Sequence, residues 1–475
     1  MTILEGKGEK TILSLLVLLC IIFSLVISCL VFQDSIASSD EWSYLIQAHI
    51  FSHGRLAVPS PIHREFFDHV HIVNNGRYYS KYPPGWPFLL AIGVLLGVPR
   101  IVNPLLGAGT LLLLYAMGKQ LYTPKIALLA SLCALASPYF LFNTASYFAH
   151  TASLFFVSLL LFLLMKGWEE RRSLYFFLAG ISGSASFLVR PFDQCAVLIP
   201  LGVFLVVALV RKQLGMHSVV AFGLGHLNGF LLFLCYNTFQ NGHPFMTGYH
   251  VADSWMDRWF GPELWMWQYT VSYFFKLLTW SFPALPILAL YTLFSSSQER
   301  VKRWERCLAS TLFGLIIAYA MIAFPEGPAY GPRYYYSGFL AIPLLGAKGF
   351  VMLFARSKLL IPVLIGTVLL DVGILFPYYS TLAYKEIYEQ NDFERQVKQI
   401  NPGPALVFLA PDPESSQAPT RNTIDFRSNI VYALDMGEKN SLLMEAYPGR
   451  RYFLYQYDQN SGQTVLREMA QDRTD

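Results

Sequence analysis

The sequence predicts an all-α polytopic membrane bundle of about eleven transmembrane helices, followed by a small α/β domain. Three observations lead to this fold class. Of the 475 residues, 54% are hydrophobic and 14% are charged, whereas a soluble domain carries about 25% charged residues. Aromatic residues make up 16% of the chain, and such side chains gather at membrane interfaces. Long apolar runs continue as far as Tyr379, and charged and turn residues replace them afterwards.

A helix needs about 20 apolar residues to cross the hydrocarbon core of a bilayer. The candidate spans, in chain order, are Thr11–Phe32, Ile101–Met117, Ile126–Phe142, Thr151–Met165, Leu174–Val189, Ala196–Val210, Ser218–Tyr236, Tyr269–Phe294, Cys307–Phe324, Gly338–Phe354 and Leu359–Tyr379. Pro87–Gly97 is apolar but too short to span, so we interpret it as an interfacial or re-entrant helix. A twelfth span is the alternative.

The basic residues of the loops predict the orientation, because Lys and Arg are enriched on the cytoplasmic side. With a cytoplasmic N-terminus, the inner loops are GKQLYTPK, MKGWEERRS, VRKQLGMH, SSSQERVKRWER and ARSK, and each carries basic residues. Counting Pro87–Gly97 as a crossing would move most of these loops to the other side. The odd number of crossings then places the C-terminal domain outside the cytoplasm.

The domain division follows from the change in composition. Residues 1–382 form the transmembrane domain, with an outer loop at residues 33–100, and residues 383–475 form the α/β domain. Short apolar runs such as Ala405–Ala410 and Tyr452–Tyr457 are typical of strands. The net charge of +4 is too small to indicate nucleic-acid binding. The six cysteines show no metal-ligand spacing.

The stretch SSDEWSYLIQAH places an acidic pair, Asp40 and Glu41, directly after the first span. The pair opens an amphipathic helix that Ser38 or Ser39 can cap, and acids in the first turn complement the helix dipole. That role alone would explain both carboxylates. Lys81, in SKYPPGWP, favours a functional interpretation, because a lysine outside runs against the positive-inside bias. It can bind an anionic lipid headgroup, or it can simply mark the interface.

The ordered series Asp40-Glu41, Tyr44, GRLAVPSP, GRYYSKYPPGWP and Arg100 resembles the first outer loop of the integral-membrane glycosyltransferases of the GT-C class. The nearest likenesses are the protein O-mannosyltransferases and the lipid A aminoarabinose transferases. The resemblance is strongest over Val31–Tyr122 and looser up to Tyr379. It implies a polyprenyl-phosphate sugar donor, Asp40 as the catalytic acid or base with Glu41 beside it, and Lys81 at the lipid phosphate. Tyr82 interrupts the Lys-Pro-Pro order of many aminoarabinose transferases.

Two arginines are further candidates for the donor phosphate. Arg333, in GPRYYYSGFLAIP, precedes a span, and Gly-Pro-Arg-Tyr is a pattern of bacterial relatives of this class. Its guanidinium suits phosphate, and Tyr334 offers a flat surface for a sugar or an isoprenoid. An interfacial Arg–Tyr belt is the alternative. Arg190 lies at a break made by Pro191, where it can pair with Asp193 or contact phosphate.

The remaining candidates line the substrate cleft. They are Tyr44, Tyr82, His150 and Tyr334. A single histidine at the end of a span is more often only hydrogen-bonded than catalytic. His243, His250, Asp253, Asp257 and Glu263 show no known metal-ligand spacing, so we expect no required cofactor and no divalent metal.

These features together predict a glycosyltransferase of the bacterial inner membrane. It would move a sugar from a polyprenyl-phosphate donor to a lipid, glycan or protein acceptor on the extracytoplasmic face. The alternative is a flippase or transporter of lipid-linked sugars, which would place polar residues at the bilayer midplane. Lys276 and Asp371 are the main charged residues inside spans. A non-catalytic scaffold for the outer domain is a third possibility.

Overall fold

A computed structural model describes residues 2–36, 38–252, 267–295, 298–321, 330–357, 360–409, 418–458 and 463–469. The chain forms two compact units, each assembled from separate segments. The first, here the helical unit, contains Met1–Asp34, Arg100–Leu234 and Asp257–Tyr384. The second, here the α/β unit, contains Ser35–Pro99, Cys235–Met256 and Lys385–Asp475.

Long apolar helices make up the helical unit, as the sequence predicts. In chain order they are α1 (Thr2–Val26) with η1 (Ile27–Val31), η3 (Pro99–Ile101) with α4 (Val102–Leu121), α5 (Pro124–Ala136), α6 (Pro138–Ala145), α7 (His150–Glu170), α8 (Ser173–Val189), α9 (Pro191–Val210), α10 (Met216–Asn241), α12 (Trp267–Trp280), α13 (Ala284–Phe294), α14 (Glu299–Ala320), η6 (Arg333–Gly338), α15 (Ala341–Arg356), α16 (Leu360–Leu370), η7 (Asp371–Leu375) and α17 (Phe376–Gln390). Pro99 of η3 and the last residues of α10 and α17 belong to the α/β unit.

Each of the eleven predicted spans falls on one or more of these helices. By length and composition, six helices of the described residues can cross a membrane, or up to eight if each bent pair is one span. The bent pairs are α5–α6, with an angle of 63°, and α12–α13, with an angle of 100°. A proline begins α6, and Pro283 precedes α13, so proline explains both breaks. Eleven crossings therefore remain a prediction.

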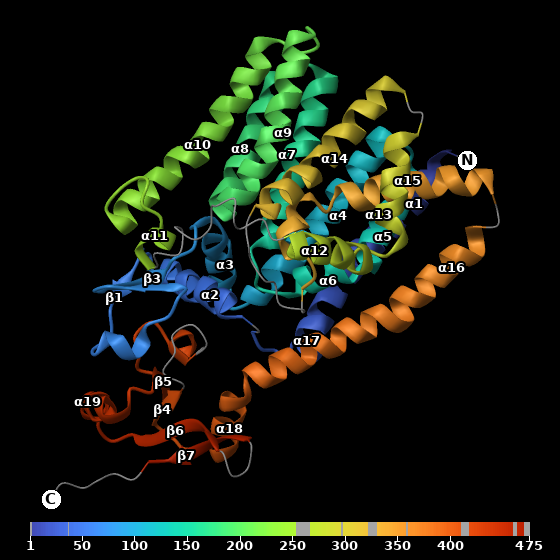
Figure 1. Ribbon diagram of the computed structural model, residues 1–475. Coiled ribbons are helices and arrows are strands. Elements are labelled where there is room, and N and C mark those ends of the chain that lie inside the picture. Colours follow the sequence, from blue (N-terminus) through green and yellow to red (C-terminus); the bar gives the residue numbers. More distant parts are fainter. Residues whose placement is uncertain are drawn as a thin grey trace, which may run out of the picture. The chain divides into compact units, whose positions relative to one another are not determined.

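Glycines permit close packing between two helices of this unit. A Cβ atom at Gly180 of α8 would lie 2.2 Å from the carbonyl oxygen of Phe222 in α10. A Cβ atom at Gly225 of α10 would lie 2.2 Å from the carbonyl oxygen of Phe177 in α8. Small residues of this kind let the backbones of membrane helices approach each other. Figure 1 shows the neighbouring helices α7, α8 and α9 running side by side.

The α/β unit contains two small sheets. Its elements are α2 (Ser39–Ser52), β1 (Val58–Pro59), η2 (Arg64–Phe67), β2 (Ile72–Asn74), β3 (Arg77–Ser80), α3 (Gly85–Leu95), α11 (Gly248–Ala252), α18 (Asp392–Ile400), β4 (Ala405–Leu409), η8 (Ala418–Arg421), β5 (Ile430–Leu434), η9 (Gly437–Lys439), α19 (Asn440–Ala446), β6 (Arg451–Asp458) and β7 (Gln463–Glu468). One sheet is antiparallel, in the order β1-β3-β2, and the other has the order β5-β4-β6-β7. Strand β4 pairs in parallel with β5 and β6, and β6 pairs antiparallel with β7 (Figure 1).

The second sheet confirms the predicted α/β character of the C-terminal residues. Alternate residues of a strand point to opposite faces. Leu406 and Phe408 of β4 accordingly join one apolar cluster, whereas Ala405 and Val407 join another. Apolar residues cover both faces, which is why the sequence of β4 reads as a continuous hydrophobic run.

The first of these clusters also contains the predicted outer loop. Phe66 packs against Phe408 with ring centroids 6.3 Å apart, and Phe426 packs against Phe67 and Tyr78 at 4.9 and 5.0 Å. The sequence predicts the loop at residues 33–100 as a part of the transmembrane domain, with a boundary near residue 382. The loop instead shares a hydrophobic core with the C-terminal residues. The antiparallel sheet in this loop was not predicted.

Candidate active site

Asp40 lies in the first turn of α2, where the sequence predicts the start of a helix. Ser38 is the N-cap, and its hydroxyl accepts a hydrogen bond from the backbone N–H of Asp40 at 3.2 Å. The same hydroxyl donates to Oδ2 of Asp40 at 2.7 Å. The predicted cap is therefore confirmed, and it also fixes one oxygen of the carboxylate.

Tyr82 and His71 face the same carboxylate. The Tyr82 hydroxyl donates to Oδ1 of Asp40 and lies 3.3 Å from Nδ1 of His71. Nε2 of His71 lies 3.7 Å from Oδ2 of Asp40, so the two form an ion pair when His71 is protonated. Burial, together with the negative charge of Asp40, raises the pKa of Tyr82 well above its usual value. Tyr82 is therefore a neutral hydrogen-bond donor at physiological pH.

The hairpin formed by β2 and β3 brings His71 and Lys81 together. Ile72 pairs with Ser80, and the backbone N–H of Lys81 donates to the carbonyl of His71 at 3.1 Å. Ser43 of α2 donates to the same carbonyl at 3.0 Å and hydrogen-bonds the hydroxyl of Ser80 at 2.6 Å. These bonds attach the hairpin to the helix that carries Asp40. His71 is not among the predicted site residues, although Asn-Gly dipeptides such as the one before Arg77 indicate hairpins.

Lys81 is almost fully buried among aromatic rings. Its ammonium lies 5.4 Å from the ring centroid of Tyr249 and 6.0 Å from that of Tyr82. Such distances are typical of cation–π contacts. Gly248 permits this arrangement, because a Cβ atom there would lie 2.4 Å from the carbonyl oxygen of Lys81. Lys81 and Asp40 therefore both lie beside Tyr82.

The charges of Asp40 and Lys81 also both act on a neighbouring histidine, His69. This side chain is buried, and the backbone N–H of His71 donates to its Nδ1 at 3.1 Å. Burial, together with the charges of His71 and Lys81, lowers the pKa of His69 to about 3, although the charge of Asp40 opposes this shift. Asp40 and Lys81 thus act on one buried imidazole.

The two remaining predicted residues of this region, Tyr44 and Glu41, lie in different surroundings. Tyr44 packs against Tyr82 with ring centroids 4.6 Å apart. Glu41 is buried, and its charge acts on Arg421. Successive helix residues point about 100° apart, so neighbours in sequence need not share a site. The predicted acidic pair is therefore split between two environments.

Arg190, the second candidate for phosphate binding, lies in the helical unit. Its Nε lies 2.8 Å from Oδ2 of Asp193, which confirms the predicted pair. Ser337 donates to the same oxygen at 2.6 Å, and the Tyr319 hydroxyl donates to the other oxygen. Arg190 also donates to the Tyr319 hydroxyl at 3.0 Å. Asp193 is fully buried, so these donors offset the cost of burying its charge.

Arg333 and Arg190 converge on Tyr334. The guanidinium carbons lie 5.5 and 5.8 Å from the centroid of the Tyr334 ring. The ring of His150 lies 6.2 Å from the same ring, and the charges of both arginines act on His150. Neither ring nitrogen of His150 has a hydrogen-bond partner among the described residues. These predicted residues therefore form one cluster, here the arginine cluster.

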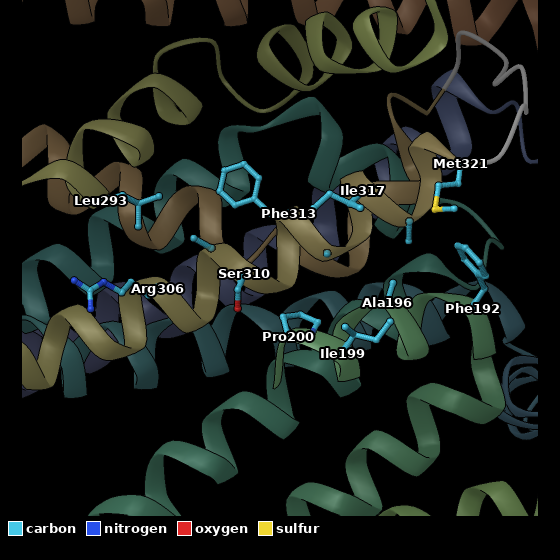
Figure 2. A pocket seen from close by; sticks show the side chains of 13 residues that line it. Phe192, Ala196, Ile199, Pro200, Leu293, Arg306, Ser310, Phe313, Ile317 and Met321 are labelled. Carbon is cyan, nitrogen blue, oxygen red and sulfur yellow. The ribbon is translucent and has the colours of Figure 1, made fainter. Parts of the chain in front are cut away.

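An apolar groove of about 610 Å³ begins beside this cluster and is lined mainly by α9 and α14. Figure 2 shows Phe192 and Met321 at one end and Arg306 at the other. The ring of Phe192 packs against Tyr319 at 4.8 Å. Tyr319 in turn bonds Asp193, so one end of the groove is continuous with the arginine cluster.

Asp253, Asp257 and Glu263 lie outside the described residues. Among the residues that the structure does describe, no group of three or more His, Cys, Asp and Glu side chains could hold a metal ion.

Comparisons with known proteins agree with this architecture. The family of dolichyl-phosphate-mannose-protein mannosyltransferases matches residues 81–236, and a domain of unknown function (DUF7846) matches residues 405–470. No curated protein matches the chain by sequence.

Solved structures of membrane enzymes share the fold. ArnT from Cupriavidus metallidurans in the apo state matches with a TM-score of 0.56 and 12% identity, over 95% of this chain and 93% of that one. Its complex with undecaprenyl phosphate gives 0.53 and 13%, over 92% and 93%. The oligosaccharyltransferase of Archaeoglobus fulgidus tethered with an acceptor peptide gives 0.57 and 11%, over 99% and 75%. The chain thus has the GT-C fold, and the family match supports a membrane glycosyltransferase.

Proposed function

We propose that this chain, a membrane glycosyltransferase with the GT-C fold, transfers a sugar from a polyprenyl-phosphate donor to an acceptor hydroxyl. The similar structure of ArnT is bound to undecaprenyl phosphate, and the matching family is named for a dolichyl-phosphate-linked sugar. The observation that carries the proposal is that the Asp40 carboxylate, which accepts hydrogen bonds from Tyr82 and Ser38, and the cation of Lys81 both lie beside Tyr82. A base next to a phosphate-binding cation is what this transfer needs.

In the proposed reaction, Asp40 is the general base. Its carboxylate accepts the proton of the acceptor hydroxyl as that oxygen bonds to the anomeric carbon. The bond from the anomeric carbon to the phosphate oxygen breaks, and its electron pair leaves with the polyprenyl phosphate. A positioned base contributes roughly 10²–10⁴-fold to the rate. With a phosphate as the acceptor, Asp40 would instead orient the donor.

Two arginines are proposed to neutralise the donor phosphate, and Lys81 is a separate candidate for a phosphate contact. Arg190 and Arg333 form the arginine cluster in the helical unit, and Lys81 lies beside Tyr82 in the α/β unit. A guanidinium presents a planar fork of donors that matches phosphate oxygens. The charge that develops on the leaving phosphate makes such donors more effective in the transition state.

Aromatic and apolar surfaces are proposed to hold the rest of the donor. Tyr44 and Tyr82 are the sugar-contact candidates of the α/β unit, and Tyr334 and His150 are those of the helical unit. The groove between α9 and α14 would take the isoprenoid chain. The groove follows α14 from Arg306 to Met321. At 1.5 Å per residue this corresponds to roughly 22 Å, a large part of the hydrocarbon thickness.

The second candidate function is transport of a lipid-linked sugar. One observation favours it: Asp371 is fully buried in η7, and neither oxygen has a hydrogen-bond partner among the described residues. Buried carboxylates inside spans often mark transport pathways. Transport breaks no glycosidic bond, so the release of lipid phosphate distinguishes the two functions.

The test uses the full chain reconstituted in liposomes with synthetic polyprenyl-phosphate sugars and candidate acceptors. Release of lipid phosphate together with a glycosylated product, detected by mass spectrometry, supports the proposal. Asp40→Asn should abolish release, whereas Asp425→Asn, which changes an exposed carboxylate of the same unit, should not. Full activity of Asp40→Asn would contradict the proposed role of Asp40. Comparing surface glycans and lipids with and without the gene would identify the acceptor.

A further inference from the structure

An arginine of the C-terminal region reaches the helix that carries Asp40. Arg421 ends η8, and its guanidinium carbon lies 4.4 Å from the ring centroid of Trp42 in α2. The side chain of Arg421 is 1% exposed. Trp42 is two positions from Asp40 in the same helical turn. A buried cation thus stacks on the first turn of α2.

The other contacts of Arg421 connect this stack to the surrounding backbone. Its Nε lies 3.3 Å from Oε1 of Glu394, and its Nη2 donates to Oδ1 of Asn391 at 2.7 Å. The Asn391 amide donates to the carbonyl of Ile36 at 3.4 Å, just before α2 begins. One guanidinium therefore connects α18 and the entry to α2 with the ring of Trp42.

Negative charges around Arg421 partly offset the effect of its burial. The pKa of Arg421 is about 10, because burial lowers it more than the negative charges of Glu394 and Glu41 raise it. Arg421 therefore remains charged at neutral pH. Glu41, predicted as the neighbour of Asp40 in the catalytic pair, is one of these negative charges. Asp40 itself faces His71 and Tyr82.

We propose that Arg421 is a positioning residue that fixes the first turn of α2, through Trp42 and Glu41, in the rotation that aims Asp40 at His71 and Tyr82. The inference rests on the proposed function of Asp40. It gives the C-terminal region, which matches a domain of unknown function, a role in completing the catalytic loop.

A purely structural role explains the buried charge less well. The aromatic contacts of Phe66, Phe67 and Tyr78 already join the loop to the C-terminal residues. Burying an ion pair contributes little net stability compared with apolar packing. Arg421 instead contributes orientation, because its planar guanidinium fixes the ring of Trp42 and the hydrogen-bonded side chain of Asn391. A misplacement of about 1 Å at a catalytic group can cost roughly 100-fold in rate.

The test compares Arg421→Lys with Arg451→Lys in the full chain, using the donor assay described above. Arg451 is an exposed control with the same kinds of partner, because it pairs with Glu468 at 2.7 Å and lies 5.0 Å from the ring of Phe453. Arg421→Lys keeps the charge but loses the planar stack. It should lower kcat about 10- to 100-fold while the KM for the donor stays unchanged. Arg451→Lys should leave both values unchanged.

A double-mutant cycle shows whether Arg421 acts through Trp42. Trp42→Ala should lower kcat as Arg421→Lys does, and the double variant should lose no more than the larger single loss. Additive losses, a loss only in donor KM, or parental kcat in Arg421→Lys would overturn the proposal. If Arg421→Lys gives no monodisperse protein, parental kcat in Trp42→Ala overturns it.

The same assay separates this inference from the proposed function. A parent chain that releases no lipid phosphate overturns the proposed function and this inference with it. An active parent that requires Asp40 but tolerates Arg421→Lys overturns only the role of Arg421.

Discussion

The hydroxyl of Tyr82 donates a hydrogen bond to Oδ1 of Asp40, across 42 positions of sequence. Ser38 donates to the other oxygen from the cap of the same helix. A carboxylate that accepts hydrogen bonds from a local and a distant hydroxyl has a fixed orientation. The contact between α2 and β3 brings the distant hydroxyl to Asp40. The loop that carries Asp40 is therefore an ordered structure with its own sheet.

Tyr82→Phe should reduce transfer without unfolding the protein. The variant keeps the ring that packs on Tyr44 but removes the hydroxyl that holds Asp40. A hydrogen bond to a charged group contributes about 1.5–3 kcal/mol, so kcat should fall roughly 10- to 100-fold. Steady-state kinetics of the reconstituted enzyme measure this. Tyr457→Phe, at an exposed position, is the control, and equal activity of the two variants would disprove the contact's role.

Lys81→Ala should raise the KM for the donor more than it lowers kcat. We assign the ammonium beside Tyr82 to the donor phosphate, so its loss should raise the apparent KM for the polyprenyl donor about 10-fold or more. Lys81→Arg, which retains the charge, should recover part of this loss. Lys398→Ala, at an exposed site, is the control. An unchanged donor KM would rule out a phosphate contact.

Much of this site was predictable because its determinants are local. The cap at Ser38, the Arg190–Asp193 pair and the strands β4 and β6 each depend on a few consecutive residues. The positions of the apolar helices follow from composition in the same way.

The rest depends on contacts between distant segments. Glu41 and Asp40 are adjacent in sequence, yet one acts on Arg421 and the other faces His71, which depends on helix rotation and tertiary packing. The core shared by Phe67 and Phe426 likewise has no local signal. The sign of a charge can be read from sequence, but its neighbours cannot.

Stability should fall in acid because of His69. Its pKa is about 3 in the folded chain, mainly through burial, whereas the ordinary value of a histidine, which the unfolded chain keeps, is 6.5. The unfolded chain therefore binds one more proton between these values, so stability is constant above about pH 6.5 and declines as the pH falls towards 3. His69→Gln should weaken the dependence of Tm on pH between about 7.5 and 5. The exposed His53→Gln is the control, and identical pH slopes in parent and His69→Gln would refute the assignment.

Topology makes a separate prediction. The positive-inside pattern predicts that Ser39 and Ser428 lie outside the cytoplasm and that Lys302 lies inside. Single cysteines at the first two positions, in a cysteine-free background, should react with an impermeant maleimide in intact cells. A cysteine at Lys302 should react only after permeabilisation. Protection of position 39 or 428 would contradict the predicted orientation.

Phe426→Ala should damage the loop that carries Asp40, although Phe426 lies far from that loop in sequence. Phe426 contacts Phe67 and Tyr78, so its truncation leaves a cavity in the core that the loop shares, at a cost of about 3–5 kcal/mol. Phe453→Ala is a matched control, because Phe453 is equally buried but belongs to the cluster without loop residues. Limited proteolysis should cleave residues 35–99 faster in Phe426→Ala than in Phe453→Ala. Activity should fall in parallel with that cleavage, since the fold of the loop is what orients Asp40. Equal cleavage in the two variants would mean that the loop folds without the C-terminal core.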